Sequence, residues 1–213
     1  DSAPCALFRS FDRVMRREED KQRTVVFVDV GHRYTTVVFG RSGEICLAKQ
    51  IPFGMARFDE EIASKLEITA TDAESLRLRL QRDEFVEDGA RHLATDALAS
   101  AAEQLAKELS LCLRYHTVTF RGKRVERAVV AGGGAHEKAL LEILQRHLSI
   151  AVESAEPFRG LDPEDIQGND ECSRSAADLA LAIGLSLKGR VASPAEAEPS
   201  DVVPEPVLEG EKA

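Results

Sequence analysis

Residues 24–40, TVVFVDVGHRYTTVVFG, constrain the fold of this chain more than any other segment. The β-branched and aromatic residues of 24–28 predict a buried strand, and residues 37–39 predict a second strand running back from it. Only a short polar segment separates the two runs. The sequence therefore predicts a β-hairpin whose strands lie inside the protein and whose turn reaches its surface.

The turn of this hairpin carries polar groups that suit a phosphate. Asp29 ends the first strand, Gly31 follows it, and the hydroxyl pair Thr35 and Thr36 precedes the second strand. A glycine turn can direct backbone N–H groups at an anion. An Asp beside such a site can hold Mg²⁺ or orient an attacking water, so Asp29 is the candidate catalytic and metal-binding residue. The alternative is a hairpin in which the acid and the glycine only form the turn.

A second glycine turn follows about a hundred residues later. Residues 124–131 predict a strand, then come Gly132, Gly133 and Gly134, and residues 136–148 predict a helix. Three glycines between a strand and a helix let a flat or anionic ligand approach the backbone. A Cβ at Gly133 would intrude on that ligand or force the backbone out of a left-handed conformation. A tight turn without a ligand is the alternative, but the two turns in this order are more specific than either alone.

The remaining periodicity predicts the rest of an α/β fold. Apolar spacing predicts helices over 4–19, 56–66, 70–82, 87–115 and 175–188, and β-rich runs predict strands over 44–51 and 150–153. The predicted core-facing residues of the last two helices are Leu98, Ala101, Leu105, Leu109 and Cys112, and Leu179, Ile183 and Leu187. Three hairpin-linked strands followed by β-α-β crossovers predict a five-stranded mixed sheet flanked by helices, which is one ribonuclease-H-like half.

Composition excludes several classes of protein. Hydrophobic residues make up 43% and charged residues 31% of the chain, as in soluble globular proteins. The net charge of −9 argues against a nucleic-acid surface, and no apolar run is long enough for a membrane span. The four cysteines are far apart, which favours free thiols. Residues 190–213 are acidic and rich in Pro and Glu, so we expect them to be disordered.

Four motifs between residues 1 and 189 resemble the carboxy-terminal portion of the PilM family of type IV pilus assembly proteins, which are actin-like ATPases. They are VDVGHRYTT, IPFG followed by FDEEIA, VVAGGGA before a helix, and DLALAIGLSLKG. The resemblance implies ATP and Mg²⁺ as cofactors. The implied nucleotide-binding residues are Asp29, Gly31, Thr35 and Thr36 in the second phosphate loop and Gly132, Gly133 and Gly134 in the adenosine motif. Glu74 and Arg77, in AESLR, resemble a ribose-contacting pair, with Arg in place of Lys.

The resemblance also implies a domain organisation. No first phosphate loop precedes Asp1, so residues 1–23 are expected to be the connecting helix from a missing amino-terminal half. Residues 24–189 would then form the second subdomain, and residues 190–213 a disordered tail. With one side of the nucleotide clamp missing, the 213-residue chain alone is expected to bind ATP weakly or not at all.

The implied function is that of a cytoplasmic ATP-binding component of a type IV pilus or type II secretion-like assembly platform at the inner membrane. Its implied partner is the short cytoplasmic tail of an inner-membrane pilus protein, through which alone it would reach the membrane. Self-association and weak ATPase activity of the full-length protein are left open. The alternatives are a non-hydrolysing scaffold of the same fold and a sugar or acetate kinase of the same superfamily.

Overall fold

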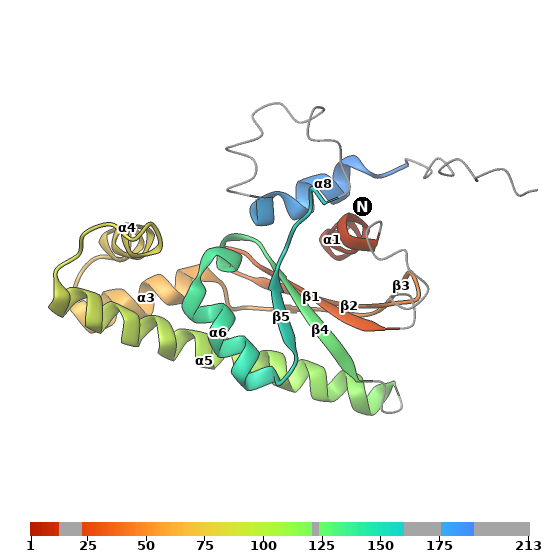
Figure 1. Ribbon diagram of the computed structural model, residues 1–213, viewed down its shortest axis with the longest axis horizontal. Helices are drawn as coiled ribbons and strands as arrows, with labels where there is room; N and C mark the ends of the chain where they lie inside the picture. Colours follow the sequence, from red (N-terminus) through yellow and green to blue (C-terminus); the bar gives the residue numbers. More distant parts are fainter. Residues whose placement is uncertain (13–22, 121–123, 160–175, 190–213) are drawn as a thin grey trace, which may run out of the picture.

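A mixed five-stranded sheet forms the centre of the molecule (Figure 1). The computed structural model describes residues 1–12, 23–120, 124–159 and 176–189. The strands are β1 (Thr24–Val30), β2 (Thr35–Arg41), β3 (Glu44–Ile51), β4 (Val125–Ala131) and β5 (Ala151–Ser154). The helices are α1 (Ala3–Asp12), α3 (Met55–Leu66), α4 (Ala70–Gln81), α5 (Asp88–Thr119), α6 (Lys138–Leu148) and α8 (Ala180–Ser186), and the short 3₁₀ turns are η1 (Gly133–His136) and η3 (Ala176–Leu179).

The strand order is β3-β2-β1-β4-β5. β1 and β2, and β2 and β3, pair antiparallel as hairpins, whereas β4 pairs parallel with both β1 and β5. The predicted five-stranded mixed sheet of an α/β fold is therefore confirmed. Because β1 and β4 run in the same direction, their carboxyl ends meet at one edge of the sheet.

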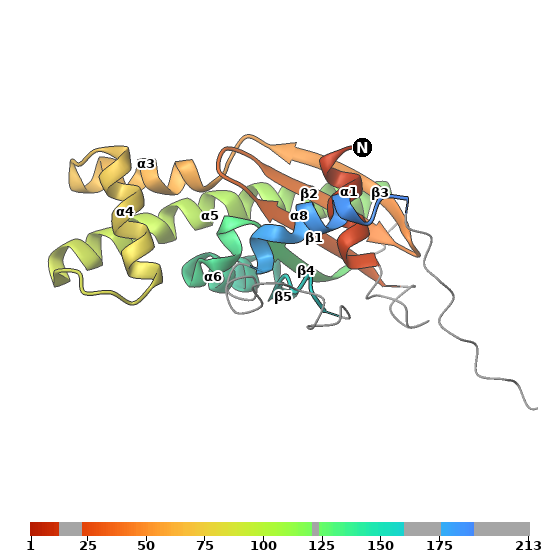
Figure 2. The same ribbon diagram turned by 90° about the horizontal axis from the view of Figure 1, so that it is seen from above.

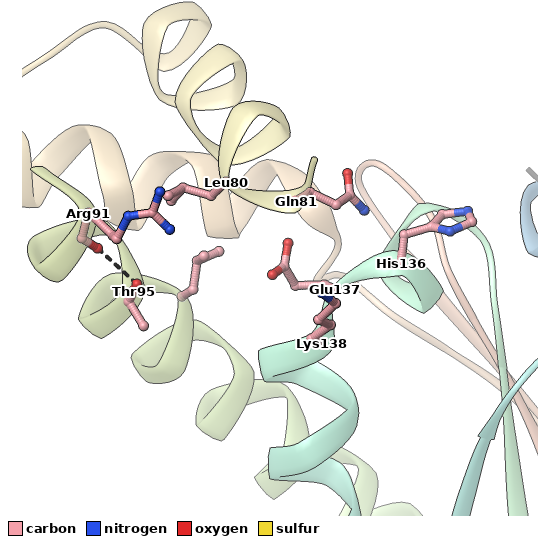
Figure 3. A pocket seen from close by; sticks show the side chains of 8 residues that line it. Leu80, Gln81, Arg91, Thr95, His136, Glu137 and Lys138 are labelled. Carbon is pink, nitrogen blue, oxygen red and sulfur yellow. Dashed lines mark hydrogen bonds between the residues drawn. The ribbon is translucent and has the colours of Figure 1, made fainter. Parts of the chain in front are cut away.

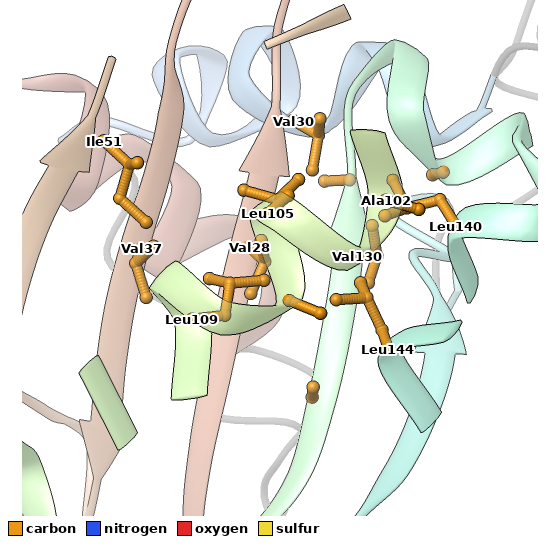
Figure 4. Close-up of a cluster of buried hydrophobic side chains, with 14 of the residues drawn as sticks. Val28, Val30, Val37, Ile51, Ala102, Leu105, Leu109, Val130, Leu140 and Leu144 are labelled. Atoms are coloured by element: carbon orange, nitrogen blue, oxygen red, sulfur yellow. The ribbon is translucent and has the colours of Figure 1, made fainter. Parts of the chain in front are cut away.

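Helices cover both faces of this sheet, as predicted. α1 and α8 lie on one face and α5 and α6 on the other, whereas α3 and α4 extend beyond the ends of the strands (Figures 1 and 2). Successive residues of β1 point to opposite faces. Phe27 stacks on Phe11 of α1 with ring centroids 5.1 Å apart, whereas Val28 faces α5 and its buried Leu105 (Figure 4). Burial on both sides explains why residues 25–28 of β1 are all apolar.

Several predicted elements differ in extent from those observed. The helix expected over 4–19 is observed from Ala3 to Asp12, and its remainder lies outside the described residues. The helix expected over 87–115 continues to Thr119, and its five predicted core residues are buried. The helix expected after the glycines begins only at Lys138, because a 3₁₀ turn comes first. The predicted disordered tail, 190–213, lies outside the described part of the chain.

The last helix is the clearest correction. A single helix over 175–188 with a core stripe of leucine and isoleucine was predicted, but a 3₁₀ turn precedes a short α8. The buried residues of this segment are small: Ala177 in η3, and Ala180 and Gly184 in α8. A Cβ on Gly184 would overlap the backbone oxygen of Ala6 in α1. The close approach of α1 to α8 therefore selects small residues where the periodicity suggested large ones.

One buried histidine makes the stability of this core depend on pH. His116 of α5 is 1% exposed and stacks between Phe39 and Phe120, with centroid distances of 4.6 and 4.7 Å, and its Nδ1 has no partner. Burial lowers the pKa of His116 below its ordinary value of 6.5. The unfolded chain therefore binds the proton more tightly, so stability is complete above pH 6.5 and falls as the pH drops from there toward the lowered pKa.

We expect the free energy of unfolding of His116→Phe to depend less on pH below 6.5 than that of the wild type. The substitution removes the titrating ring and the unpartnered nitrogen but keeps an aromatic stack. Urea unfolding of wild type and variant at several pH values between 5 and 8 measures the effect. His92, which is 80% exposed at its side chain, provides the control: His92→Phe should leave the pH dependence as it is. An unchanged slope in His116→Phe would contradict the assignment.

Candidate functional site

The candidate site lies at the sheet edge where β1 and β4 end. Asp29 is in register with Thr36 of β2 on one side and with Ala131 of β4 on the other. The hairpin turn after β1 and the glycine turn after β4 therefore leave the sheet side by side. Residues that are about a hundred positions apart in the sequence meet here because the two strands are parallel neighbours.

The hairpin turn is fixed by the segment that follows β3. Gly31 N–H donates to Tyr34 O at 3.0 Å, and Gly31 O accepts from Met55 N–H at 2.9 Å. Ala56 N–H donates to His32 O at 2.8 Å. A Cβ on Gly54 would lie 2.5 Å from His32 O, so only a glycine allows this approach. The turn is thus held rigidly before any ligand is present.

The tip of this turn offers donors. Within the described residues, the backbone N–H groups of His32, Arg33 and Tyr34 donate to no other backbone carbonyl, and the three residues are exposed. Exposed N–H groups in a tight turn can receive an anion. The predicted hydroxyl pair contributes less, because Thr35 Oγ1 already donates to Phe53 O at 2.7 Å in the buried interior. Thr36 is 8% exposed.

The three glycines of the second turn differ in their surroundings. Gly132 has φ 75°, its N–H donates to Ala177 O at 3.0 Å, and a Cβ there would overlap Asp29 Oδ1. Gly134 packs against Val30, which a Cβ would approach to 2.6 Å. Gly133 is exposed, and only Met55 Cγ would lie within 4 Å of a Cβ, at 3.9 Å. The left-handed conformation expected at Gly133 is therefore found at Gly132 instead.

Asp29 lies in an electrostatic environment that sequence reasoning did not predict. Burial raises the pKa of the Asp29 carboxyl above its ordinary 3.8, and the negative charge of Asp178 raises it further. Asp178 comes from η3, and its Oδ1 is 3.2 Å from His136 Nε2, within ion-pair distance although not aligned for a hydrogen bond. Asp178 is the first residue of the DLALAIGLSLKG motif, so this motif was the sequence feature from which an acid near the site could have been predicted.

A cavity of about 140 Å³ continues from the second glycine turn. It lies between the end of α4, the first turns of α5 and residues 136–138, and Figure 3 shows the Glu137 side chain directed from the start of α6 toward α4. Glu137 is 7% exposed, and its Oε2 has no partner. Sequence reasoning passed over Glu137; the only signal was an acid between the glycine turn and an apolar helix.

The predicted ribose-contacting pair is not part of this cavity. Glu74 is exposed on α4 and does not line it. Arg77 is buried, and its Nε donates to Asp59 Oδ1 of α3 at 2.6 Å while its Nη2 donates to Oδ2 at 3.3 Å. The guanidinium therefore joins α4 to α3. A contact of either residue with a ribose stays a prediction.

The residues at this edge fit a magnesium nucleotide. Gly133 follows Gly132, which adjoins Asp29, and leaves its own backbone open to solvent. The hairpin tip presents backbone N–H groups that donate to no other backbone carbonyl of the described residues. Mg²⁺ bound to phosphates typically needs only one or two protein carboxylates, and Asp29 and Asp178 supply that number. Among the residues described, no group of three or more metal-ligating side chains gathers anywhere.

Comparisons with known proteins identify the fold. The family model for type IV pilus assembly protein PilM matches residues 4–190. Among solved structures, the chain is similar to the PilM-PilN type IV pilus biogenesis complex, with a TM-score of 0.73, 21% identity, and coverage of 89% of this chain and 52% of that one. No curated protein sequence matches the chain.

Two further solved structures share this architecture. Ethanolamine utilization protein EutJ from Carboxydothermus hydrogenoformans gives a TM-score of 0.60 at 16% identity, covering 88% of this chain and 54% of that one. MreB5 of Spiroplasma citri bound to AMPPNP gives 0.56 at 13% identity, covering 86% and 57%. At such identities the likeness shows the actin-like fold alone. The chain spans about half the length of the proteins it resembles.

Proposed function

Because the chain belongs to the type IV pilus assembly protein PilM family, we propose that the intact protein binds ATP with Mg²⁺ at the edge where β1 and β4 end. It is a PilM-like actin-fold protein of type IV pilus assembly. The binding of a nucleotide would give the assembly a ligand-controlled component.

One observation carries this proposal: the close contact between Asp29 and the second glycine turn. Gly132 takes a positive φ and has no room for a Cβ beside Asp29 Oδ1, while its neighbour Gly133 is exposed with space above it. Positive φ excludes most side chains at Gly132, but no contact with the described residues requires glycine at Gly133. A ligand passing over the backbone would account for the glycine there. The similar MreB5 structure was solved with AMPPNP, which supports an adenine nucleotide as that ligand.

Each site residue then has a physical role. The backbone N–H groups of the hairpin tip would receive phosphate oxygens, and Asp29 would hold the cation that neutralises them. Mg²⁺, when bound, supplies charge that offsets the phosphates. It would also offset the negative charge of Asp178, which raises the pKa of Asp29.

A partner would bring the protein to the inner membrane. The similar solved structure is a complex of PilM with PilN, which supports a pilus assembly protein as partner. No helix in the described ranges is long and apolar enough to cross a membrane. We therefore propose binding to the short cytoplasmic tail of an inner-membrane pilus protein, with self-association left open. Calorimetric titration of the intact protein with a synthetic peptide of that tail tests the interaction, and absence of binding would contradict it.

A comparison of two adjacent glycines tests the nucleotide site. Gly133→Val should leave the fold of the intact protein unchanged, since its side chain would project into open space, but should weaken Mg·ATP binding by about tenfold or more. Gly132→Ala should instead lower stability by about 1–3 kcal/mol, through its positive φ and the overlap with Asp29. Melting temperatures of both variants and wild type, with and without Mg·ATP, separate the two effects.

The same experiment decides between the alternatives. If Mg·ATP raises the melting temperature of wild type but not of Gly133→Val, the glycine turn lies against the nucleotide. If Mg·ATP leaves every melting temperature unchanged, the proposal is wrong and a scaffold without nucleotide becomes the better description.

A further inference from the structure

We propose that Glu137 is the residue that selects the base of the bound nucleotide, by accepting a hydrogen bond from the exocyclic amino group of adenine. The inference rests on the proposed nucleotide site and adds the determinant of base specificity. The cavity between α4, α5 and α6 would then prefer a base that donates a hydrogen bond to Glu137.

The unpartnered oxygen of Glu137 is the main observation. A buried carboxylate oxygen without a hydrogen bond is costly, so a structure that keeps one requires an explanation. Three other polar side chains around the cavity are already engaged, whereas His136 Nε2 is also buried without a hydrogen bond but lies 3.2 Å from Asp178 Oδ1. Arg91 Nη2 donates to Glu84 O at 3.1 Å, Thr95 Oγ1 donates to Arg91 O at 2.8 Å, and Lys138 Nζ is 3.4 Å from Asp83 Oδ2. Glu137 Oε2 is thus the buried acceptor still available to a ligand.

The shape and position of the cavity suit a purine. Its walls include the apolar side chains of Leu80 and Leu98, which can contact the face of a flat ring, and Glu137 stands at one end (Figure 3). Gly132 adjoins Asp29, and the cavity is lined from His136 onward, at the end of the same turn. A nucleotide with its phosphates beside Asp29 would therefore extend along this turn toward Glu137. The adenine amino group is the hydrogen-bond donor on that base.

A neighbouring charge helps to keep Glu137 an acceptor. Burial raises the pKa of the Glu137 carboxyl above its ordinary 4.5, and Asp59 raises it too, but the guanidinium of Arg77 opposes both. Arg77 is itself held by Asp59 in a bidentate pair. The pair that joins α3 to α4 therefore also places a positive charge behind the carboxylate, which favours the ionised, accepting form.

The test compares two ligands that differ only in the amino group. Isothermal titration of the intact protein with Mg·ATP and with Mg·purine riboside 5′-triphosphate, which lacks that group, should show a preference for ATP of about tenfold or more, as expected for a hydrogen bond to a charged acceptor. Glu137→Met keeps the length of the side chain but removes the acceptor, so the two ligands should bind it equally. Glu137→Gln keeps one neutral acceptor and should retain a reduced preference.

Two controls make the outcome decisive. Glu142 is exposed on the same helix outside the cavity, so Glu142→Met should keep the wild-type preference. Thermal melting without nucleotide shows whether each variant is folded, and if Glu137→Met does not fold, the smaller preference of Glu137→Gln decides.

Failure of this inference differs from failure of the proposed function. If the wild type binds both ligands equally well, or if Glu137→Met retains the preference for ATP, nucleotide binding stands and Glu137 does not select the base. If the wild type binds neither ligand, both proposals are wrong.

Discussion

Arg77→Met is expected to lower the free energy of unfolding by about 3–5 kcal/mol, because it leaves the buried carboxylate of Asp59 without its partner. Both side chains of this pair are less than 10% exposed, and the guanidinium makes two hydrogen bonds to the carboxylate. For a chain of this size the loss corresponds to a decrease in melting temperature of about 6–20 °C. Chemical unfolding monitored by circular dichroism measures it.

An exposed ion pair on the same helix hairpin provides the control. Arg57 of α3 lies 2.7 Å from Glu60, but both side chains are about half exposed. Arg57→Met should therefore change stability by less than about 1 kcal/mol. In a second control, Asp59→Leu combined with Arg77→Met should restore much of the lost stability, because no buried charge then remains unpaired. Equal losses in Arg57→Met and Arg77→Met would show that burial is not the reason for the effect.

Gly184→Ala is expected to lower the free energy of unfolding by about 1–3 kcal/mol, because the added methyl group would push α8 away from α1. The added Cβ would overlap Ala6 O, and backbone atoms cannot yield as a flexible side chain can. Separation would also break the bond from Arg9 Nη1 to Gly184 O, which measures 2.7 Å. The melting temperature of the variant measures the effect.

The matched control is Gly89 in the first turn of α5. A Cβ on Gly89 would meet nothing within 4 Å, so Gly89→Ala should be neutral or slightly stabilising, as alanine favours a helix. Because both substitutions are Gly→Ala in helices, their difference isolates the contact between α1 and α8. A Gly184→Ala variant as stable as Gly89→Ala would contradict the close packing of the two helices.

The sequence by itself determined the sheet and most of its helices. The run from Val25 to Val28 is apolar at every position, and such a run suits a strand buried on both faces. In α5 the apolar residues recur at helical spacing, and this local periodicity is independent of what the helix packs against. The two glycine turns were also visible, since glycine is the preferred residue where the chain turns tightly or approaches another backbone.

Only the tertiary structure decided which charges meet. The local motif of Arg77 suggests a contact with a ribose, which stays a prediction, but no local pattern indicates its pairing with Asp59 of the neighbouring helix. Asp178, near the other end of the described chain, acts on the charge of Asp29, and Glu137 Oε2 is buried without a hydrogen bond. Local patterns determine strands and helices, because these depend on neighbours in sequence. Pairings between side chains depend on how the helices pack on the sheet, which no local pattern records.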